Sequence, residues 1–240
     1  MTYNPWPAGD LPAHWQRPEL KQVMDRYALS DPRDVIKLFE RKVADYAGSK
    51  YAVAVDSCTN ALFLCLRYFY NSEDGDVFRI EVTIPPHTYI SVPQTIKNAG
   101  YKLYFHNIQD GYKFKWDGFY RLDPYPIYDM AVRFTKNMYI PNTFCCLSFQ
   151  IKKRLPIGKG GMILTDSLEA YNWLRKARYE GRDTDKPYDE DMIEFTGWNM
   201  YMTPEDAARG IMIFDELPEY NEDICDWSNY HDLRKQKVFQ

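Results

Sequence analysis

The chain has 240 residues, of which 45% are hydrophobic and 27% are charged. This composition is that of a globular protein long enough to bury a core, and it excludes a disordered chain, a collagen and a coiled coil. The 30 Lys and Arg residues are balanced by 34 Asp and Glu residues, giving a net charge of −4, so no excess of positive charge indicates a polyanionic partner.

Residues 1–33 are rich in proline and predict an irregular N-terminal arm with one helix over 18–27. No basic segment followed by an apolar run occurs at the start, so we expect no signal peptide. No stretch approaches the roughly 20 apolar residues of a membrane-spanning helix. The 5 cysteines include no CxxC pair, which argues against a disulfide framework or a zinc knuckle and favours a reducing cytoplasm.

After the arm, helix patterns alternate with strand patterns. Helical periodicity covers 34–47, 60–70, 91–99, 167–180 and 203–217. Short apolar or β-branched runs predict strands over 51–55, 79–84, 101–107, 127–128, 144–149 and 161–165. The alternation predicts an α/β fold with a mainly parallel sheet flanked by helices. No repeat or linker interrupts it, so we expect one domain over 34–240.

Small polar residues stand between the strand at 51–55 and the next helix. Ser57, Cys58 and Thr59 open that helix, whose first N–H groups have no partner within it. With the helix dipole, these groups predict a cradle for an anion or a phosphate. The alternative is a plain N-cap, in which Ser57 or Thr59 satisfies the free donors.

A loop with two lysines follows the strand at 144–149. The segment SFQIKKRLPIGKGG contains Ser148, Lys152 and Lys153 and ends in a GxGG pattern before the next strand. A lysine in a dry pocket has a lowered pKa and can form a Schiff base with an aldehyde. The alternative is a basic surface turn in which the glycines serve the backbone.

Two further candidates follow strands. Asp129 comes at the carboxyl end of the run at 127–128, where α/β sheets bind ligands, and its carboxylate suits a protonated ring nitrogen; the alternative is a helix cap. Tyr89 follows the strand at 79–84 and suits stacking on a planar cofactor; the alternative is a core aromatic. Neighbouring His87 is expected to be a capping or loop histidine, since no second metal ligand stands four residues away.

Each of these signals is weak alone. Together they place a phosphate cradle, a stacking aromatic, an acid and a lysine at the ends of successive strands. This set is what a site for pyridoxal 5′-phosphate (PLP) requires.

The sequence also resembles the DegT/DnrJ-type sugar aminotransferases, which are PLP-dependent enzymes of fold type I. The similarity runs from about residue 34 to residue 217. Its motifs occur in the family's order, as FERKVADYAGSKYAVAVDSCTNAL at 39–62, PPHTYIS at 85–91, YDMA at 128–131, SFQIKKRLPIGKGG at 148–161, RYEGRD at 178–183 and GWNMYMTPEDAARG at 197–210.

The resemblance implies roles for individual positions. It makes Lys153 the lysine that bonds to PLP and Asp129 the acid that faces the pyridine nitrogen, the two catalytic residues. Tyr89 takes the place of the ring-stacking aromatic. Asn199 matches an asparagine that reaches the phosphate from the neighbouring subunit, which implies a homodimer with active sites at the subunit interface. The remaining cofactor-binding positions fall on Ser57, Cys58, Thr59 and Ser148.

The activity implied is that of a PLP-dependent aminotransferase. Glutamate is the expected amino donor, and a keto-sugar, commonly nucleotide-linked, is the expected acceptor, in amino-sugar and surface polysaccharide biosynthesis. The expected partners are these small molecules and a second copy of the chain, with no nucleic acid, membrane or metal, in the cytoplasm. Lysine at position 153, where dehydratase relatives have histidine, favours transamination.

The sequence departs from the family pattern in two ways. Single positions differ, namely Cys58 for a glycine, Gln150 for a histidine, Lys159 for a glutamate, and Val132 where a polar residue is usual. Whole segments differ as well. The span 107–129 is about half the usual length, so a βα unit is expected to be shortened, and the sequence reads as a shortened version lacking most of the small C-terminal domain.

These departures leave two other hypotheses open. In one, the chain is a PLP-binding or scaffold protein of the same fold, without independent turnover and in need of a partner for the missing domain. In the other, it is an α/β domain without a cofactor.

Overall fold

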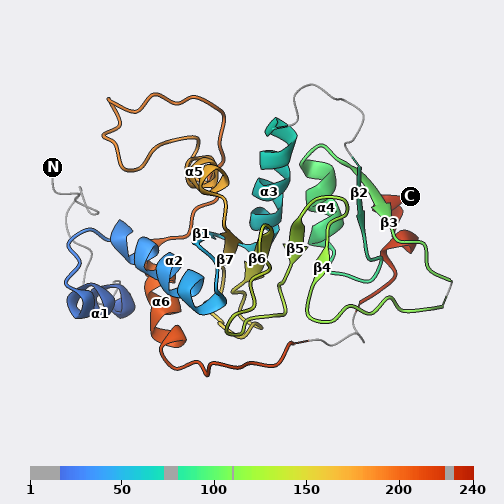
Figure 1. Ribbon diagram of the computed structural model, residues 1–240, viewed down its shortest axis with the longest axis horizontal. Coiled ribbons are helices and arrows are strands. Elements are labelled where there is room, and N and C mark those ends of the chain that lie inside the picture. The colour runs from blue at the N-terminus through green and yellow to red at the C-terminus, as the bar shows by residue number, and fades with distance from the viewer. Residues whose placement is uncertain (1–16, 73–80, 110, 225–229) are drawn as a thin grey trace.

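The computed structural model describes residues 17–72, 81–109, 111–224 and 230–240. Figure 1 shows a central sheet with helices on both sides. One side carries α3 (Cys58–Ser72), α4 (Ser91–Asn98) and α5 (Leu168–Ala177). The other carries α1 (Pro18–Tyr27), α2 (Arg33–Ala47) and α6 (Pro204–Phe214). The predicted α/β fold class is confirmed.

The strands form two hydrogen-bonded groups. The larger has the order β1 (Tyr51–Val55), β7 (Gly161–Thr165), β6 (Phe144–Ser148), β5 (Ile127–Asp129), β4 (Tyr120–Arg121). The smaller pairs β2 (Glu81–Ile84) with β3 (Lys102–Phe105) in parallel, and a bridge between Thr83 and Asp123 joins the two groups. From these pairings, β1, β2, β3, β5 and β6 share one direction, whereas β7 and β4 run against it.

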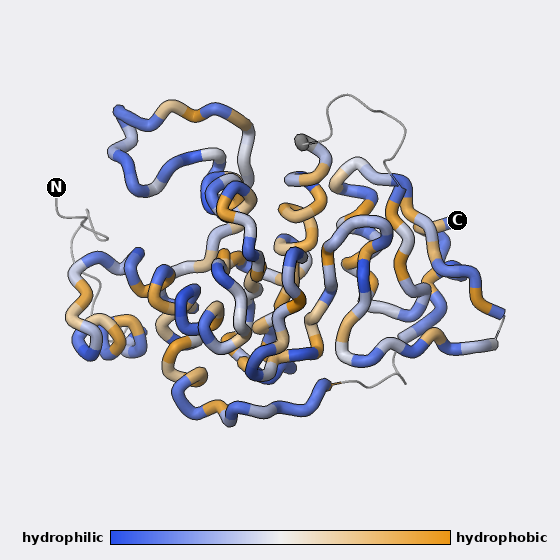
Figure 2. The backbone as a smooth tube through the Cα atoms, viewed as in Figure 1, coloured by the Kyte–Doolittle hydropathy of each residue, from blue (hydrophilic) through white to orange (hydrophobic). Residues whose placement is uncertain are grey.

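The alternation of side chains along each strand divides the core into two layers. Val53 and Val55 of β1 pack with α3 and α5, whereas Ala52 and Ala54 face α2 and α6. Because β1 contributes apolar residues to both layers, it reads as a continuous apolar run. Figure 2 shows hydrophobic residues gathered in the central strands and along α3. Burial on both faces is typical of strands in a three-layer α/β fold.

The connection from β3 to β5 contains the short strand β4 and no helix among its described residues. Tyr120 of β4 pairs with Asp129 of β5, so the two strands form an antiparallel hairpin. The hairpin stands where the sequence indicates a shortened βα unit. It brings an aromatic residue directly beside the acid at the end of β5.

Some boundaries differ from the sequence-based expectations. The helix predicted over 167–180 ends at Ala177, because Glu180 and Gly181 adopt positive φ angles that a helix does not allow. The helix predicted over 203–217 ends at Phe214. Residues 1–16 of the predicted arm and residues 79–80 of a predicted strand lie outside the described residues. The division into an arm over 1–33 and a large domain over 34–240 stays a prediction.

Two further findings concern general properties. Among the described residues, no helix is both long and apolar enough to span a bilayer. The four cysteines in that part of the chain, Cys58, Cys65, Cys145 and Cys146, are buried and unpaired. Cys225 lies outside it.

A buried ion pair ties α2 to the end of α5. Glu40 of α2 accepts hydrogen bonds from the amide of Ala54, at 2.8 Å, and from the guanidinium of Arg178, which also donates to the carbonyl of Ala54. The side chain of Glu40 is buried, and that of Arg178 is only 11% exposed. Removing one partner from such a pair leaves the other charge without compensation.

We therefore expect Arg178→Met to lower the free energy of unfolding by about 3–5 kcal/mol. The matched control is Arg26→Met, because Arg26 pairs with Asp215 at 2.7 Å but is 61% exposed. That control is expected to cost no more than about 1 kcal/mol. Urea unfolding followed by circular dichroism measures both values, and equal losses for the two variants would contradict the prediction.

Candidate active site

A cavity of about 380 Å³ opens at the carboxyl ends of β5 and β6, next to the N-terminus of α3. This is the edge at which α/β sheets bind ligands, and the volume is that of a small-molecule site. Asp129 is the last residue of β5 and Ser148 the last of β6. The predicted site residues that line the cavity are Ser57, Cys58, Thr59, Tyr89, Asp129, Ser148 and Lys153.

The N-terminus of α3 forms one wall. The hydroxyl of Ser57 accepts a hydrogen bond from the amide of Asn60 at 3.2 Å, so Ser57 is an N-cap, as the alternative interpretation expects. In the described part of the chain, the amides of Cys58 and Thr59 have no acceptor. The wall therefore offers both free N–H groups and the positive end of a helix dipole to an anion.

Gly161, the first residue of β7, allows this wall to lie close to the sheet. A Cβ atom at this position would come within 2.5 Å of the carbonyl carbon of Ser57 and 2.6 Å of the amide nitrogen of Cys58. Only glycine permits this approach. The GxGG pattern thus has a packing role that fixes the start of α3 over the ends of the strands.

Asp129 lies at the base of the cavity and is 6% exposed. One carboxylate oxygen accepts from the hydroxyl of Tyr120 at 2.7 Å, and the other accepts from the amide of Ala131 at 2.9 Å. Because the single proton of Tyr120 is directed to Asp129, the hydroxyl of Thr88 donates to the Tyr120 oxygen. No helix follows Asp129, so the helix-cap alternative is wrong.

The electrostatic environment of Asp129 is mixed. Burial raises the pKa of its carboxyl, whereas the hydrogen bonds from Tyr120 and Ala131 and the positive charge of Lys153 lower it, and the net shift is upward. The thiol of Cys58 lies 3.9 Å from the same carboxylate. Burial and the charge of Asp129 raise the pKa of Cys58 well above its usual value, so the thiol stays protonated.

Three lysines line the cavity. Lys159 is held by Asp56, with its ammonium nitrogen 3.0 Å from a carboxylate oxygen. Within the described residues, the ammonium group of Lys153 has no ion pair or hydrogen bond, yet its charge lowers the pKa of both Asp129 and Cys58. Lys153 is therefore the amine available to a ligand in this cavity. Lys152 is its neighbour on the same loop.

Of the predicted residues Tyr89 and Asn199, only Tyr89 lies at the cavity. Tyr89 is 63% exposed and lines the cavity, so it is not a core aromatic. Asn199 does not line the cavity. Its side-chain amide donates to Glu180 at 2.7 Å, and its backbone forms a bridge with Tyr179.

Several residues in or beside the cavity were not assigned to the site from the sequence. Tyr120, which contacts Asp129, lies in a strand too short to show periodicity. Trp116 and Tyr230 form an aromatic side of the cavity. His87 is a buried loop histidine, as expected: its ring nitrogen accepts from the amide of Phe114 and its carbonyl accepts from the indole of Trp116.

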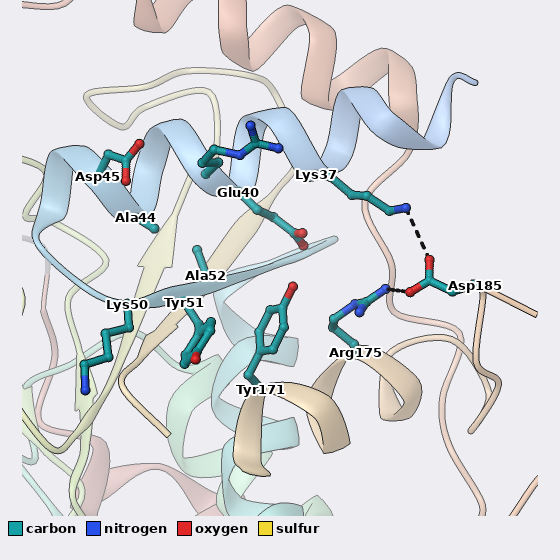
Figure 3. A pocket seen from close by; sticks show the side chains of 11 residues that line it. Lys37, Glu40, Ala44, Asp45, Lys50, Tyr51, Ala52, Tyr171, Arg175 and Asp185 are labelled. Atoms are coloured by element: carbon teal, nitrogen blue, oxygen red, sulfur yellow. Dashed lines mark hydrogen bonds and ion pairs between the residues drawn. The ribbon is translucent and has the colours of Figure 1, made fainter. Parts of the chain in front are cut away.

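A second cavity, of about 330 Å³, lies between α2, β1 and α5 (Figure 3). Its charges are largely compensated within the protein. Asp185 pairs with Lys37 at 3.2 Å and with Arg175 at 2.7 Å. Its buried carboxylate, Glu40, is already paired with Arg178, whereas among the described residues Asp129 of the first cavity has no ion pair.

Comparison with known proteins identifies a family. The profile of the DegT/DnrJ/EryC1/StrS aminotransferase family matches residues 14–115 and 141–227. Asp129 and the β4–β5 hairpin fall between the two matched stretches. The spore coat polysaccharide biosynthesis protein SpsC of Bacillus subtilis is 39% identical over 75 residues, which are 31% of this chain and 18% of SpsC.

Solved structures share the fold. AtS13 from Actinomadura melliaura is 21% identical, with a TM-score of 0.63, over 82% of this chain and 65% of AtS13. Helicobacter pylori PseC, an aminotransferase involved in the biosynthesis of pseudoaminic acid, is 17% identical, with a TM-score of 0.60, over 76% of this chain and 57% of PseC. The chain thus spans less than two thirds of the length of each of these proteins.

The Tyr120–Asp129 hydrogen bond generates a pH-dependent prediction. Because burial raises the pKa of Asp129, the folded protein holds this proton more tightly than the unfolded chain. Stability from this group is therefore highest in acid and decreases as the pH rises through the native pKa. Tyr120→Phe removes a donor to the charged carboxylate. We expect it to lower the free energy of unfolding by about 1.5–3 kcal/mol at pH 8, and by less at pH 4.5.

The control for this variant is Tyr104→Phe, because Tyr104 is 48% exposed and its hydroxyl donates to Glu81 at the surface. It is expected to change stability by less than about 0.5 kcal/mol at either pH. Urea unfolding at the two pH values provides the measurement. A loss for Tyr120→Phe that does not depend on pH would refute a role in stabilising the ionised carboxylate.

Proposed function

The chain belongs to the DegT/DnrJ/EryC1/StrS aminotransferase family, and we propose that it transfers an amino group from glutamate to a keto-sugar, which we further propose to be linked to a nucleotide. Members of this family are PLP-dependent sugar aminotransferases. The observation that carries the proposal is the gathering of three features around one cavity: a lysine that forms no ion pair with any described residue, a buried carboxylate and an open helix N-terminus. The product would be an amino sugar for a surface polysaccharide.

The residues around the cavity fit PLP. The N–H groups of Cys58 and Thr59, with the hydroxyl group of Ser148, suit its phosphate, whereas the hydroxyl of Ser57 already donates to Asp56. The carboxylate of Asp129 suits a protonated pyridine nitrogen, and the exposed ring of Tyr89 suits one face of the pyridine. A PLP molecule bound here supplies an aldehyde that condenses with amines and a ring that accepts electrons from the substrate.

The residues of the chain then have distinct tasks. The amine of Lys153 would take a proton from the carbon of the donor that carries the amino group. It would later deliver a proton to the carbon of the acceptor that receives the amino group. Asp129 holds a proton on the facing ring nitrogen, and Tyr120 and the amide of Ala131 keep its carboxylate ionised and oriented. The first turn of α3 anchors the phosphate, so the reacting atoms stay next to Lys153.

We include a location in the cytoplasm in the same proposal, and the cysteines support it. Cys58, Cys65, Cys145 and Cys146 are free thiols. The sulfur atoms of Cys65 and Cys146 lie 3.7 Å apart without a bond. Persistent free thiols are typical of a reducing compartment.

Lysine substitution tests the chemistry. We expect the wild-type protein incubated with PLP to hold it through a borohydride-reducible bond to Lys153, identified by peptide mass spectrometry. Lys153→Ala is expected to abolish this bond. Lys152→Ala is the matched control and is expected to retain it, because it is the charge of Lys153 that acts on Asp129 and Cys58.

Glutamate then tests the reaction itself. Its addition is expected to shift the absorbance of the bound cofactor to shorter wavelength in the wild-type protein and not in Lys153→Ala. Binding of PLP without any response to an amino acid would favour the scaffold hypothesis. A protein that takes up no PLP would contradict the proposal altogether.

We further propose a homodimer in which Asn199 of one subunit serves the phosphate of the other. The position of Asn199 away from the cavity of its own chain supports this arrangement. Asn199→Ala and Lys153→Ala are each expected to lower the rate of the glutamate reaction at least tenfold. Because a mixed dimer has one site with both residues intact, mixing the unfolded variants and refolding them together is expected to restore up to about a quarter of the wild-type rate. No recovery would contradict a shared site.

A further inference from the structure

One side of the active-site cavity is aromatic and is not used by the groups described so far. Trp116 is buried and lines the cavity, and Tyr230 lines it beside Trp116, with the two ring centroids 5.9 Å apart. The indole nitrogen of Trp116 donates to the carbonyl of His87 at 3.1 Å, which fixes the ring. Trp116 therefore presents the apolar surface of its ring to the cavity, because its indole nitrogen already has a hydrogen-bond acceptor.

Tyr230 comes from a segment far along the chain, and that segment is anchored. Figure 1 shows the C-terminal residues beside β3. The amide of Leu233, a buried residue, donates to the carbonyl of Pro86 at 2.9 Å, and Arg234 donates to the carbonyl of Ile108 at 2.9 Å. Lys97 of α4 donates to the carbonyl of Val238 at 3.0 Å. Tyr230 is thus held at a defined place in the wall.

Residues 223–224, which precede Tyr230 in the chain, are also anchored beside the cavity. Asp223 receives two hydrogen bonds from Arg133, at 2.6 and 3.0 Å. The amide of Ile224 donates to the carbonyl of Val132 at 2.9 Å, and Val132 itself lines the cavity. These contacts make residues 223–224 and 230–240 part of the frame around the cavity.

We propose that Tyr230, together with Trp116, is the platform on which the ring of the amino-acceptor sugar packs. This inference rests on the proposed function and names the residues that select its substrate. A sugar ring has an apolar C–H face, which suits an aromatic surface, and its hydroxyl groups remain free for polar partners. Glutamate is a small, charged donor and needs no such surface. Tyr230 therefore discriminates the second substrate from the first.

The experiment compares sugar binding with cofactor and donor binding in the PLP-loaded full chain. The variants are Tyr230→Ala and Tyr230→Phe. The control is Tyr220→Ala, because Tyr220 precedes Tyr230 on the same stretch of chain, is 77% exposed and does not line the cavity. The probes are dTDP-glucose and UDP-N-acetylglucosamine, with binding measured by titration calorimetry and by quenching of tryptophan fluorescence.

We expect the wild-type protein to bind at least one of the two nucleotide sugars. Tyr230→Ala is expected to raise the Kd at least tenfold, whereas Tyr230→Phe and Tyr220→Ala stay within threefold of wild type. The affinity for PLP and the absorbance change with glutamate are expected to be the same in all four proteins. This pattern separates a substrate-facing residue from one that only supports the fold.

Three results would overturn the inference. The first is that Tyr230→Ala binds the sugars as tightly as the wild-type protein. The second is that Tyr230→Ala loses affinity for PLP and keeps its affinity for the sugars. The third is that the wild-type protein binds neither sugar. Failure of the proposed function is distinguishable, because it would show as a wild-type protein that does not respond to glutamate. The effect of Tyr230→Ala on sugar binding is measured independently of that response.

Discussion

The buried carboxylate of Asp129 is the group on which the site depends. A charge without water needs several partners, and Asp129 has them from separate parts of the chain: Tyr120 from β4, the amide of Ala131 from its own loop, and the charge of Lys153 from the loop after β6. The β4–β5 hairpin supplies the first of these in a segment too short for a βα unit. The acid is thus supported by a strand pair in place of a βα unit.

Much of the fold was predictable, because its elements are bounded by strong local signals. The strands at 51–55 and 161–165 and the helix at 18–27 begin and end at the predicted residues. They are apolar or amphipathic runs next to glycine, proline or polar residues, and tertiary packing agrees with these signals. The predicted lining residues share a cavity for a topological reason. They follow parallel strands, whose carboxyl ends meet at one edge of the sheet.

The remaining parts depend on contacts that have no local signature. The end of α5 is set by the backbone conformation of Glu180 and Gly181. That conformation depends on hydrogen bonds to residues elsewhere in the chain. Tyr120 lies in a two-residue strand that exists only because β5 pairs with it. Trp116 and Tyr230 meet across a long separation in sequence. A sequence pattern reports neighbours along the chain, so it identified the residues at strand ends and not those brought in from elsewhere.

The anchoring of the C-terminal residues has a consequence for folding kinetics. Arg234 and Ile108 are 126 positions apart in sequence, and Lys97 and Val238 are 141 apart. These contacts are made to β3, α4 and their neighbours, so they need those elements in place. The aromatic wall is therefore complete only when residues 230–240 have docked on elements formed by earlier parts of the chain. During synthesis on the ribosome, the strands that bear Asp129 and Ser148 emerge before the residues that complete the cavity wall.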